Sequence, residues 1–504
     1  MRSRTIAAIS LALLGPLAAC TNDRAFPADF AFGTAVAGFQ VDMGCPTIPA
    51  AECEDRKSDW YAYVTSTAAI AKTQTHLAGD QPSAGPGFYE LYAADLDRVK
   101  ALGLDSFRLS LEWSRIFPES TAGVEGYEAL KARASPAGLA YYHAIFAAMK
   151  ARGLRPLVTL HHYTLPSWIH DGRGCTLDLD HCSPRGWLEP SIVGEIAKYA
   201  GFAAREFGGE VDRWATLNEP MAVVIPGYLM PTAARTNPPA QLLRYAEAKT
   251  ALFSMIHAHA RMVDAVREND LIDADADGRA TFIGLVYPVA PVLPKDPANP
   301  LDQRGAQNIA YIYNDLFLNA VLKGELDDDL SGKGEVQSDL VGRSDYLGLN
   351  YYFKVVVVGA EDSFLPAFSP LLTFDPFRLE QGETYPEGLR EVLRDLKAKH
   401  PSTPILITEN GADAAIAGGP EAFLAAHLRS LLDAIHQDGV DVRGYFWWSL
   451  MDNFEWNHGM GMKFGLYAVD PRDSTKARVA RPTADLLRRV ATERALPAAL
   501  SGPM

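Results

Sequence analysis

Short apolar runs recur along the chain and alternate with longer stretches in which apolar residues return every three or four positions. The short runs, which predict strands, cover residues 30–35, 106–111, 155–160, 213–218, 281–286, 346–351, 404–409 and 442–450. The longer stretches, which predict helices, cover residues 91–102, 137–152, 192–207, 242–267, 306–323, 387–399 and 421–438. Apolar strands that alternate with helices are typical of a parallel sheet covered by helices, and eight such units predict a single α/β domain, a (β/α)8 barrel.

Three long irregular segments, residues 45–87, 288–303 and 358–386, interrupt this pattern without the composition change of a linker. We therefore expect one barrel domain with long loops over residues 26–495, followed by a tail at 496–504. In such barrels the functional site lies where strands end and the following loops begin. Polar residues at strand ends are therefore the candidates.

The first 19 residues have the pattern of an export signal. Two arginines precede an apolar run over residues 6–17, which is too short to cross a bilayer but long enough for a signal-peptide core. The Leu-Ala-Ala-Cys string that ends at Cys20 resembles a bacterial lipoprotein signal, and Cys20 would then carry the lipid. We expect residues 20–25 to be a tether and the protein to be exported and lipid-anchored, facing the periplasm or the cell surface. An ordinary secreted protein is the alternative.

The other four cysteines fall into two close pairs in polar segments that are typical of loops. Proximity favours the disulfides Cys45–Cys53 and Cys175–Cys182 among the three possible connectivities, and an oxidising compartment would let both form. Metal binding is the competing interpretation, but the CxxC spacing usual at zinc sites is missing.

Charge narrows the class of partner. The chain of 504 residues has 47 Lys and Arg against 62 Asp and Glu, a formal net charge of −15. Nucleic-acid phosphates would be repelled by this balance, so no nucleic-acid partner is expected. A neutral or cationic small substrate is compatible with it.

Two glutamates follow apolar strands at corresponding places. Glu219 stands in the string TLNEP and Glu409 in the string ITENG, 190 residues apart. A closed barrel could bring them face to face, and glycosidic-bond cleavage requires two such carboxyl groups, one as a proton donor and one as an anion. The alternative is that both are N-terminal caps of the following helices.

Several motifs in order carry a family resemblance. They are FPADFAFGTAVAGFQ from Phe26, FRLSLEWSRIFP, LHHYTLPSW, TLNEP, LGLNYY, ITENG and GYFWWSLMDNFEW. Together they resemble glycoside hydrolase family 1, the retaining β-glucosidases and β-glycosidases, with the EWSRIFP form closest to the archaeal-type members. The resemblance covers about residues 26 to 490 and makes the barrel a catalytic domain.

The resemblance implies a role for each residue of the reacting centre. Glu219 would be the general acid/base and Glu409 the nucleophile. Arg108 would lie beside Glu409 and help to keep it ionised. Asn218 would bind the 2-hydroxyl of the sugar, and Tyr352 would donate a hydrogen bond near Glu409.

The family resemblance also implies the sugar-binding residues. They are Gln40, His162, Trp448, Glu455 and Trp456. Trp448 would form a stacking floor, and Trp447, its neighbour on the strand, would point away. His162 and Trp456 could instead be core residues. A Glu455 anion would repel a phosphate on the sugar, so an unphosphorylated substrate is expected.

The expected activity is the release of non-reducing terminal β-D-glucosyl residues, and of related galactosyl or fucosyl residues, from small β-glycosides or oligosaccharides. No cofactor and no metal are needed for this reaction. The alternatives are a transglycosylase that uses the same intermediate and a non-catalytic carbohydrate-binding relative.

Some positions depart from the family pattern or carry another signal. Met221 and the pair Tyr163–Thr164 replace commoner residues, and His458 lies in an unusual rim where it could touch the aglycone. Residues 273–278 (DADADG) resemble the start of a calcium loop, but the bidentate Glu expected at its end is missing. We therefore expect an acidic surface loop there.

Overall fold

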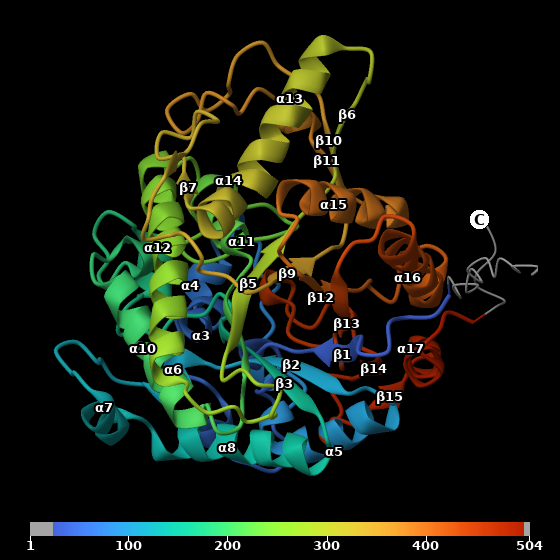
Figure 1. Cartoon of the computed structure of the whole chain (residues 1–504). Coiled ribbons are helices and arrows are strands. Elements are labelled where there is room, and N and C mark those ends of the chain that lie inside the picture. The colour runs from blue at the N-terminus through green and yellow to red at the C-terminus, as the bar shows by residue number, and fades with distance from the viewer. Residues whose placement is uncertain (1–23, 498–504) are drawn as a thin grey trace, which may run out of the picture.

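Eight parallel strands close into a barrel in the computed structural model, which describes residues 24–497 (Figure 1). The barrel strands are β1 (Ala31–Ala35), β2 (Ser106–Ser110), β3 (Arg155–His161), β4 (Arg213–Asn218), β5 (Phe282–Pro288), β9 (Leu347–Asn350), β12 (Ile405–Asn410) and β13 (Val442–Trp448). Their order around the barrel is β1-β13-β12-β9-β5-β4-β3-β2. Each predicted strand supplies one of these, so the (β/α)8 architecture is confirmed.

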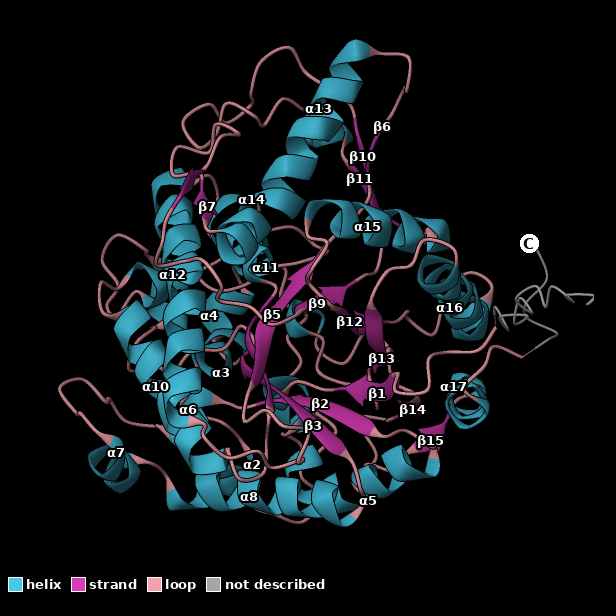
Figure 2. Cartoon of the chain, in the orientation of Figure 1, coloured by secondary structure: helices cyan, strands magenta, loops and turns pink. Residues whose placement is uncertain are grey.

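Helices surround the barrel on the outside (Figure 2). The long ones are α5 (Phe88–Ala101), α8 (Pro136–Ala151), α10 (Ile192–Phe207), α12 (Tyr245–Asn269), α13 (Pro300–Ala310), α15 (Pro386–Lys399), α16 (Gly419–His436) and α17 (Pro482–Glu493). α10 shows why they form, because Ile192, Ile196, Tyr199 and Ala203 recur every three or four positions and are all buried. The helix predicted over 306–323 is instead α13 followed by wider turns around α14 (Leu316–Leu318), and α17 was not predicted.

The predicted irregular segments carry short elements of their own. Residues 45–87 contain α2 (Ala50–Cys53), α3 (Asp59–Val64) and α4 (Thr67–Ile70). The other two segments supply β6 (Val292–Pro294) and β11 (Glu380–Glu383), which flank β10 (Lys354–Val357) in a small sheet that stands with α13 at the top of Figure 1. The remaining elements are α1 (Gly38–Val41), α6 (Trp113–Ile116), α7 (Tyr127–Arg133), α9 (Gly172–Leu177), α11 (Pro220–Val224), β7 (Glu325–Leu326), β8 (Glu335–Val336), β14 (Tyr467–Ala468) and β15 (Val479–Ala480).

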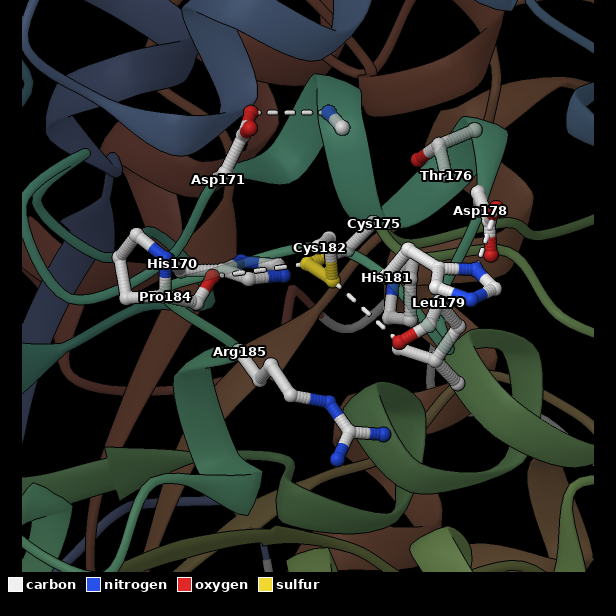
Figure 3. Close-up of a disulfide and its surroundings, with 12 residues drawn as sticks. His170, Asp171, Cys175, Thr176, Asp178, Leu179, His181, Cys182, Pro184 and Arg185 are labelled. Carbon is white, nitrogen blue, oxygen red and sulfur yellow. Dashed lines mark hydrogen bonds and ion pairs between the residues drawn. A yellow bond between two sulfur atoms is a disulfide. The ribbon is translucent and has the colours of Figure 1, made fainter.

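Both predicted disulfides are present. Cys45–Cys53 closes a turn that contains α2, and Cys175–Cys182 joins α9 to the following loop (Figure 3). Gln241 donates a hydrogen bond to the carbonyl of Cys175 at 2.9 Å, which ties this loop to the segment before α12. The disulfide therefore stabilises the long connection between β3 and α10.

The two ends of the described chain lie together. Ala25 and Ala495 form an antiparallel bridge, and Leu496 is buried. The signal segment, Cys20 and the last seven residues lie outside the described residues. Between residues 24 and 497, no helix combines the length and apolar character needed to span a bilayer.

The acidic segment 273–278 is an exposed loop before β5, as predicted. The Asp273 carboxylate accepts the backbone N–H groups of Asp277 and Gly278 at 3.1 and 2.9 Å. Asp212 likewise accepts the N–H groups of Ala274 and Asp275. These carboxylates therefore organise the turn through its backbone.

Candidate active site

The two predicted glutamates stand at the same end of the barrel. Glu219 follows β4 directly, and Glu409 lies near the end of β12. Glu219 has a left-handed backbone (φ 46°), which is uncommon for a residue with a side chain. It precedes α11, but its side chain caps no N–H group of that helix. The helix-cap interpretation of Glu219 is therefore wrong.

Glu409 is held by two donors. Arg108 Nη1 lies 2.5 Å from its Oε1, and the Tyr352 hydroxyl donates to its Oε2 at 2.7 Å. Arg108 and Glu409 are both buried. Burial raises the pKa of Glu409, while the Arg108 cation and the Tyr352 hydrogen bond lower it. Arg108 lies beside Glu409, where its charge opposes the effect of burial on this pKa.

Glu219 is likewise held through both oxygens. Asn350, the last residue of β9, donates to Oε1 at 2.7 Å, and the Tyr163 hydroxyl donates to Oε2. Thr408 donates to Asn350 Oδ1 at 2.8 Å, which fixes the amide so that its NH2 group faces Glu219.

Asn218 connects the two carboxyl groups. Its Oδ1 accepts from Arg108 Nη2 at 2.7 Å and from Asn350 Nδ2 at 3.3 Å. A continuous path of hydrogen bonds therefore runs from Glu409 through Arg108, Asn218 and Asn350 to Glu219. Two groups 190 residues apart in the sequence thus belong to one network.

The predicted sugar-binding residues border this network. Trp448 ends β13, and the His162 ring stacks against both Trp448 and Trp456 at centroid distances of 5.8 and 5.9 Å. Trp447 instead packs edge-on against Phe423 of α16, so the predicted alternation of the two tryptophans is confirmed.

The polar members of this border are also in contact. Gln40 Nε2 donates to Glu455 Oε2 at 2.9 Å. Within the described chain, Gln40 Oε1 and His162 Nδ1 are buried without a protein partner. Buried polar atoms are nearly always hydrogen-bonded, so these two atoms are candidates for ligand contact. Both ring nitrogens of His161 are likewise buried without a protein partner among residues 24–497, and its ring packs edge-on against Trp187.

Glu455 also faces a cation that the sequence did not single out. Arg235 Nη1 lies 3.7 Å from its Oε1. Burial raises the pKa of Glu455 to about 7, and the Arg235 cation partly offsets this rise. Near neutral pH Glu455 is therefore only partly ionised, so its charge repels a phosphorylated sugar less than a full anion would.

The sequence does not mark three further side chains of the site as functional. Asn350 lies within the LGLNYY string, and Tyr163 stands out only as a departure from the family pattern. Arg235 stands in an irregular segment with no pattern to mark it. Of the other departures, Met221 is buried, and the His458 ring bonds the Ala234 carbonyl at 3.0 Å.

Comparison with known proteins decides the family. The chain matches the family described as Glycosyl hydrolase family 1 over residues 22–495. The chain belongs to glycosyl hydrolase family 1. The family resemblance noted in the sequence is thereby confirmed, and the protein is a glycosidase, so the non-catalytic alternative is set aside.

Individual family 1 relatives match over nearly their whole length. The β-galactosidase of Pyrococcus woesei is 34% identical over 498 residues, covering 90% of this chain and 94% of its own. The peroxisomal β-glucosidase 26 of Arabidopsis thaliana is 28% identical, covering 90% and 82%. Among solved structures, the β-glycosidase of Thermosphaera aggregans has a TM-score of 0.80 at 29% identity, covering 94% and 98%. The β-glucosidase of Pyrococcus furiosus has a TM-score of 0.78 at 30% identity, covering 95% and 98%.

Proposed function

We propose that this family 1 enzyme is a retaining exo-β-glycosidase in which Glu409 is the nucleophile and Glu219 the general acid/base. The observation that carries the proposal is the network that joins the two carboxyl groups through Arg108, Asn218 and Asn350. It gives the two glutamates different surroundings. Glu409 lies against a full positive charge, whereas within residues 24–497 Glu219 accepts hydrogen bonds from neutral donors only.

In the first step a Glu409 oxygen attacks the anomeric carbon while the bond from that carbon to the leaving oxygen breaks. Glu219 gives its proton to the leaving oxygen, so the aglycone departs as a neutral alcohol. Arg108 and Tyr352 hold the attacking carboxylate in place. The product of the step is a glycosyl ester on Glu409.

In the second step Glu219, now ionised, takes a proton from water. The water oxygen attacks the anomeric carbon, and the ester bond to Glu409 breaks. Two displacements at one carbon restore the β configuration. Asn218 would bind the sugar 2-hydroxyl, a contact that strengthens as the anomeric carbon gains positive charge.

The substrate class follows from the border of the network. Trp448 offers a flat face to the sugar ring, and Gln40 with Glu455 offers an amide beside a carboxyl group for neighbouring hydroxyls. This combination suits a terminal β-glucosyl unit. The names of the relatives support glucosyl and galactosyl units as the first to test.

The proposal is tested with three variants on an aryl β-glucoside. Glu409→Ala should lose nearly all turnover. Glu219→Ala should be rescued by azide, which needs no base, and should yield the β-glycosyl azide. Glu128→Ala, an exposed glutamate on α7, is the matched control and should keep wild-type turnover. Normal turnover by Glu409→Ala would overturn the assignment, and products formed only with an added sugar acceptor would indicate a transglycosylase.

We also propose that the enzyme is exported and lipid-anchored through Cys20. The signal pattern supports this, and the two disulfides are consistent with an oxidising compartment. In bacterial expression, a radiolabelled fatty acid should be incorporated into the wild-type chain but not into Cys20→Ser. Equal labelling of both would refute the anchor.

A further inference from the structure

The hydroxyl of Tyr163 lies between the acid/base and the residue expected to bind the sugar. It donates a hydrogen bond to Glu219 Oε2 and accepts one from Asn218 Nδ2 at 3.1 Å. Burial, followed by the nearby charge of Glu219, raises the pKa of the Tyr163 phenol. The phenol therefore keeps its proton and remains a donor.

Its surroundings hold the Tyr163 ring in this position. The backbone of Tyr163 is left-handed (φ 73°), a rare state for an aromatic residue, and the side chain is 5% exposed. The ring packs edge-on against Trp456 at 4.8 Å, and the Arg235 guanidinium lies over its face at 4.7 Å. A ring fixed by the backbone and by two neighbours leaves its hydroxyl little freedom.

We propose that Tyr163 is a positioning residue for Glu219, which orients the acid/base and favours its ionised form through the phenol hydrogen bond. The proposal rests on the role proposed for Glu219. A donor to a carboxylate stabilises the anion over the acid. The same contact holds the Glu219 carboxylate in place as the base of the second step.

Other charged and titratable groups also face this site, and all of them remain when the phenol alone is removed. They are Glu409, Glu455, Tyr352 and Tyr313, together with Arg108, Arg235 and His162. A difference in pH profile between wild type and Tyr163→Phe therefore reports on the phenol.

The test is the pH profile of kcat/KM of the full chain on phenyl β-glucoside, whose poor leaving group needs a proton. In Tyr163→Phe the alkaline limb should move up by about one to two pH units, the effect of losing one hydrogen bond to a charged group. The acid limb should stay in place, because the bonds to Glu409 are intact. A lower kcat/KM at every pH without a shift of the alkaline limb would overturn the proposal.

Two further variants test whether the shift of the alkaline limb comes from the hydrogen bond that Tyr163 donates. Tyr199→Phe is the matched control: that buried phenol bonds the Leu160 carbonyl at 3.1 Å, outside the network, and the profile should match wild type. Incorporation of 3-fluorotyrosine at position 163 makes a stronger donor and should move the alkaline limb down. An unchanged limb there would also contradict the proposal.

The double variant separates failure of this proposal from failure of the proposed function. In a Glu219→Ala background rescued by azide, adding Tyr163→Phe should change the rescued rate less than about twofold, because the phenol has lost its partner. Absence of azide rescue in the single Glu219→Ala variant would overturn the role of Glu219. Rescue with an equally large Tyr163→Phe effect in both backgrounds would overturn only the role of Tyr163.

Discussion

Replacing Arg108 by methionine removes the positive charge that counteracts the effect of burial on the pKa of Glu409. The shortest contact between the two groups is 2.5 Å. With charge centres about 4 Å apart and an effective dielectric constant near 20, the attraction is about 4 kcal/mol. Divided by 1.36 kcal/mol per pH unit, this corresponds to a displacement of about two to three pH units in the acid limb of the rate profile.

The pKa of Glu409 is already raised by burial, so the loss of Arg108 raises it further. Glu409 then becomes protonated at higher pH, and a protonated carboxyl group does not attack the anomeric carbon. The acid limb of the kcat/KM profile of Arg108→Met should move up by the same two to three pH units. At pH values on the acid side of both limbs, kcat/KM of Arg108→Met should be about two to three orders of magnitude below that of wild type, about tenfold for each pH unit of displacement.

The assay is the pH dependence of kcat/KM on an aryl β-glucoside. The pH position of the acid limb is compared, because Arg108 also bonds Asn218 and its loss should raise KM as well. The matched control is Arg478→Met, which breaks another buried pair, with Asp95 at 2.7 Å, that takes no part in the hydrogen-bond network of the two glutamates. That variant should lose stability but keep the wild-type limb positions. An acid limb of Arg108→Met that coincides with wild type would refute the reasoning.

Three further outcomes follow from the structure. Replacing Cys175 and Cys182 by alanine should lower the free energy of unfolding, measured in urea titrations, by about 2–3 kcal/mol, the loop-entropy value for a separation of seven residues. An unchanged free energy of unfolding would contradict a formed disulfide. Burial raises the pKa of Glu112 from 4.5 to about 8, so its contribution to stability should be lost as pH rises between these values. In thermal scans, the loss of stability over this pH range should be smaller for Glu112→Gln than for wild type. Parallel curves of Tm against pH for the two proteins would contradict this. Because burial raises the pKa of Glu455 to about 7, KM for a β-glucoside should rise below pH 7 in wild type and not in Glu455→Gln; equal pH dependence would exclude this contact.

Most of the fold could be predicted from the pattern of apolar runs along the chain. Barrel strands are buried on both faces and read as apolar runs, and β4 was predicted to the residue. The helix over 306–323 was not, because its backbone widens around α14 without a proline or glycine to mark the place. α17 was missed because no barrel strand follows it to complete the alternating pattern.

The site was predictable where residues belong to a strand end and a motif. Trp448 and Trp447 could be assigned to opposite faces because side chains alternate along a strand. Tyr163 could not be linked to Glu219, since the contact depends on a left-handed backbone that the sequence does not announce. Arg235 reaches Glu455 from an irregular segment, where no periodicity relates position to direction.

Trapping the glycosyl-enzyme tests the account most directly. The wild-type enzyme is treated with a 2-deoxy-2-fluoro-β-glucosyl fluoride, which forms the ester quickly and hydrolyses slowly, and the digest is analysed by mass spectrometry. We predict one labelled peptide, with the sugar on Glu409. A stoichiometric label on another residue, or an α-configured first product from a normal substrate, would contradict it.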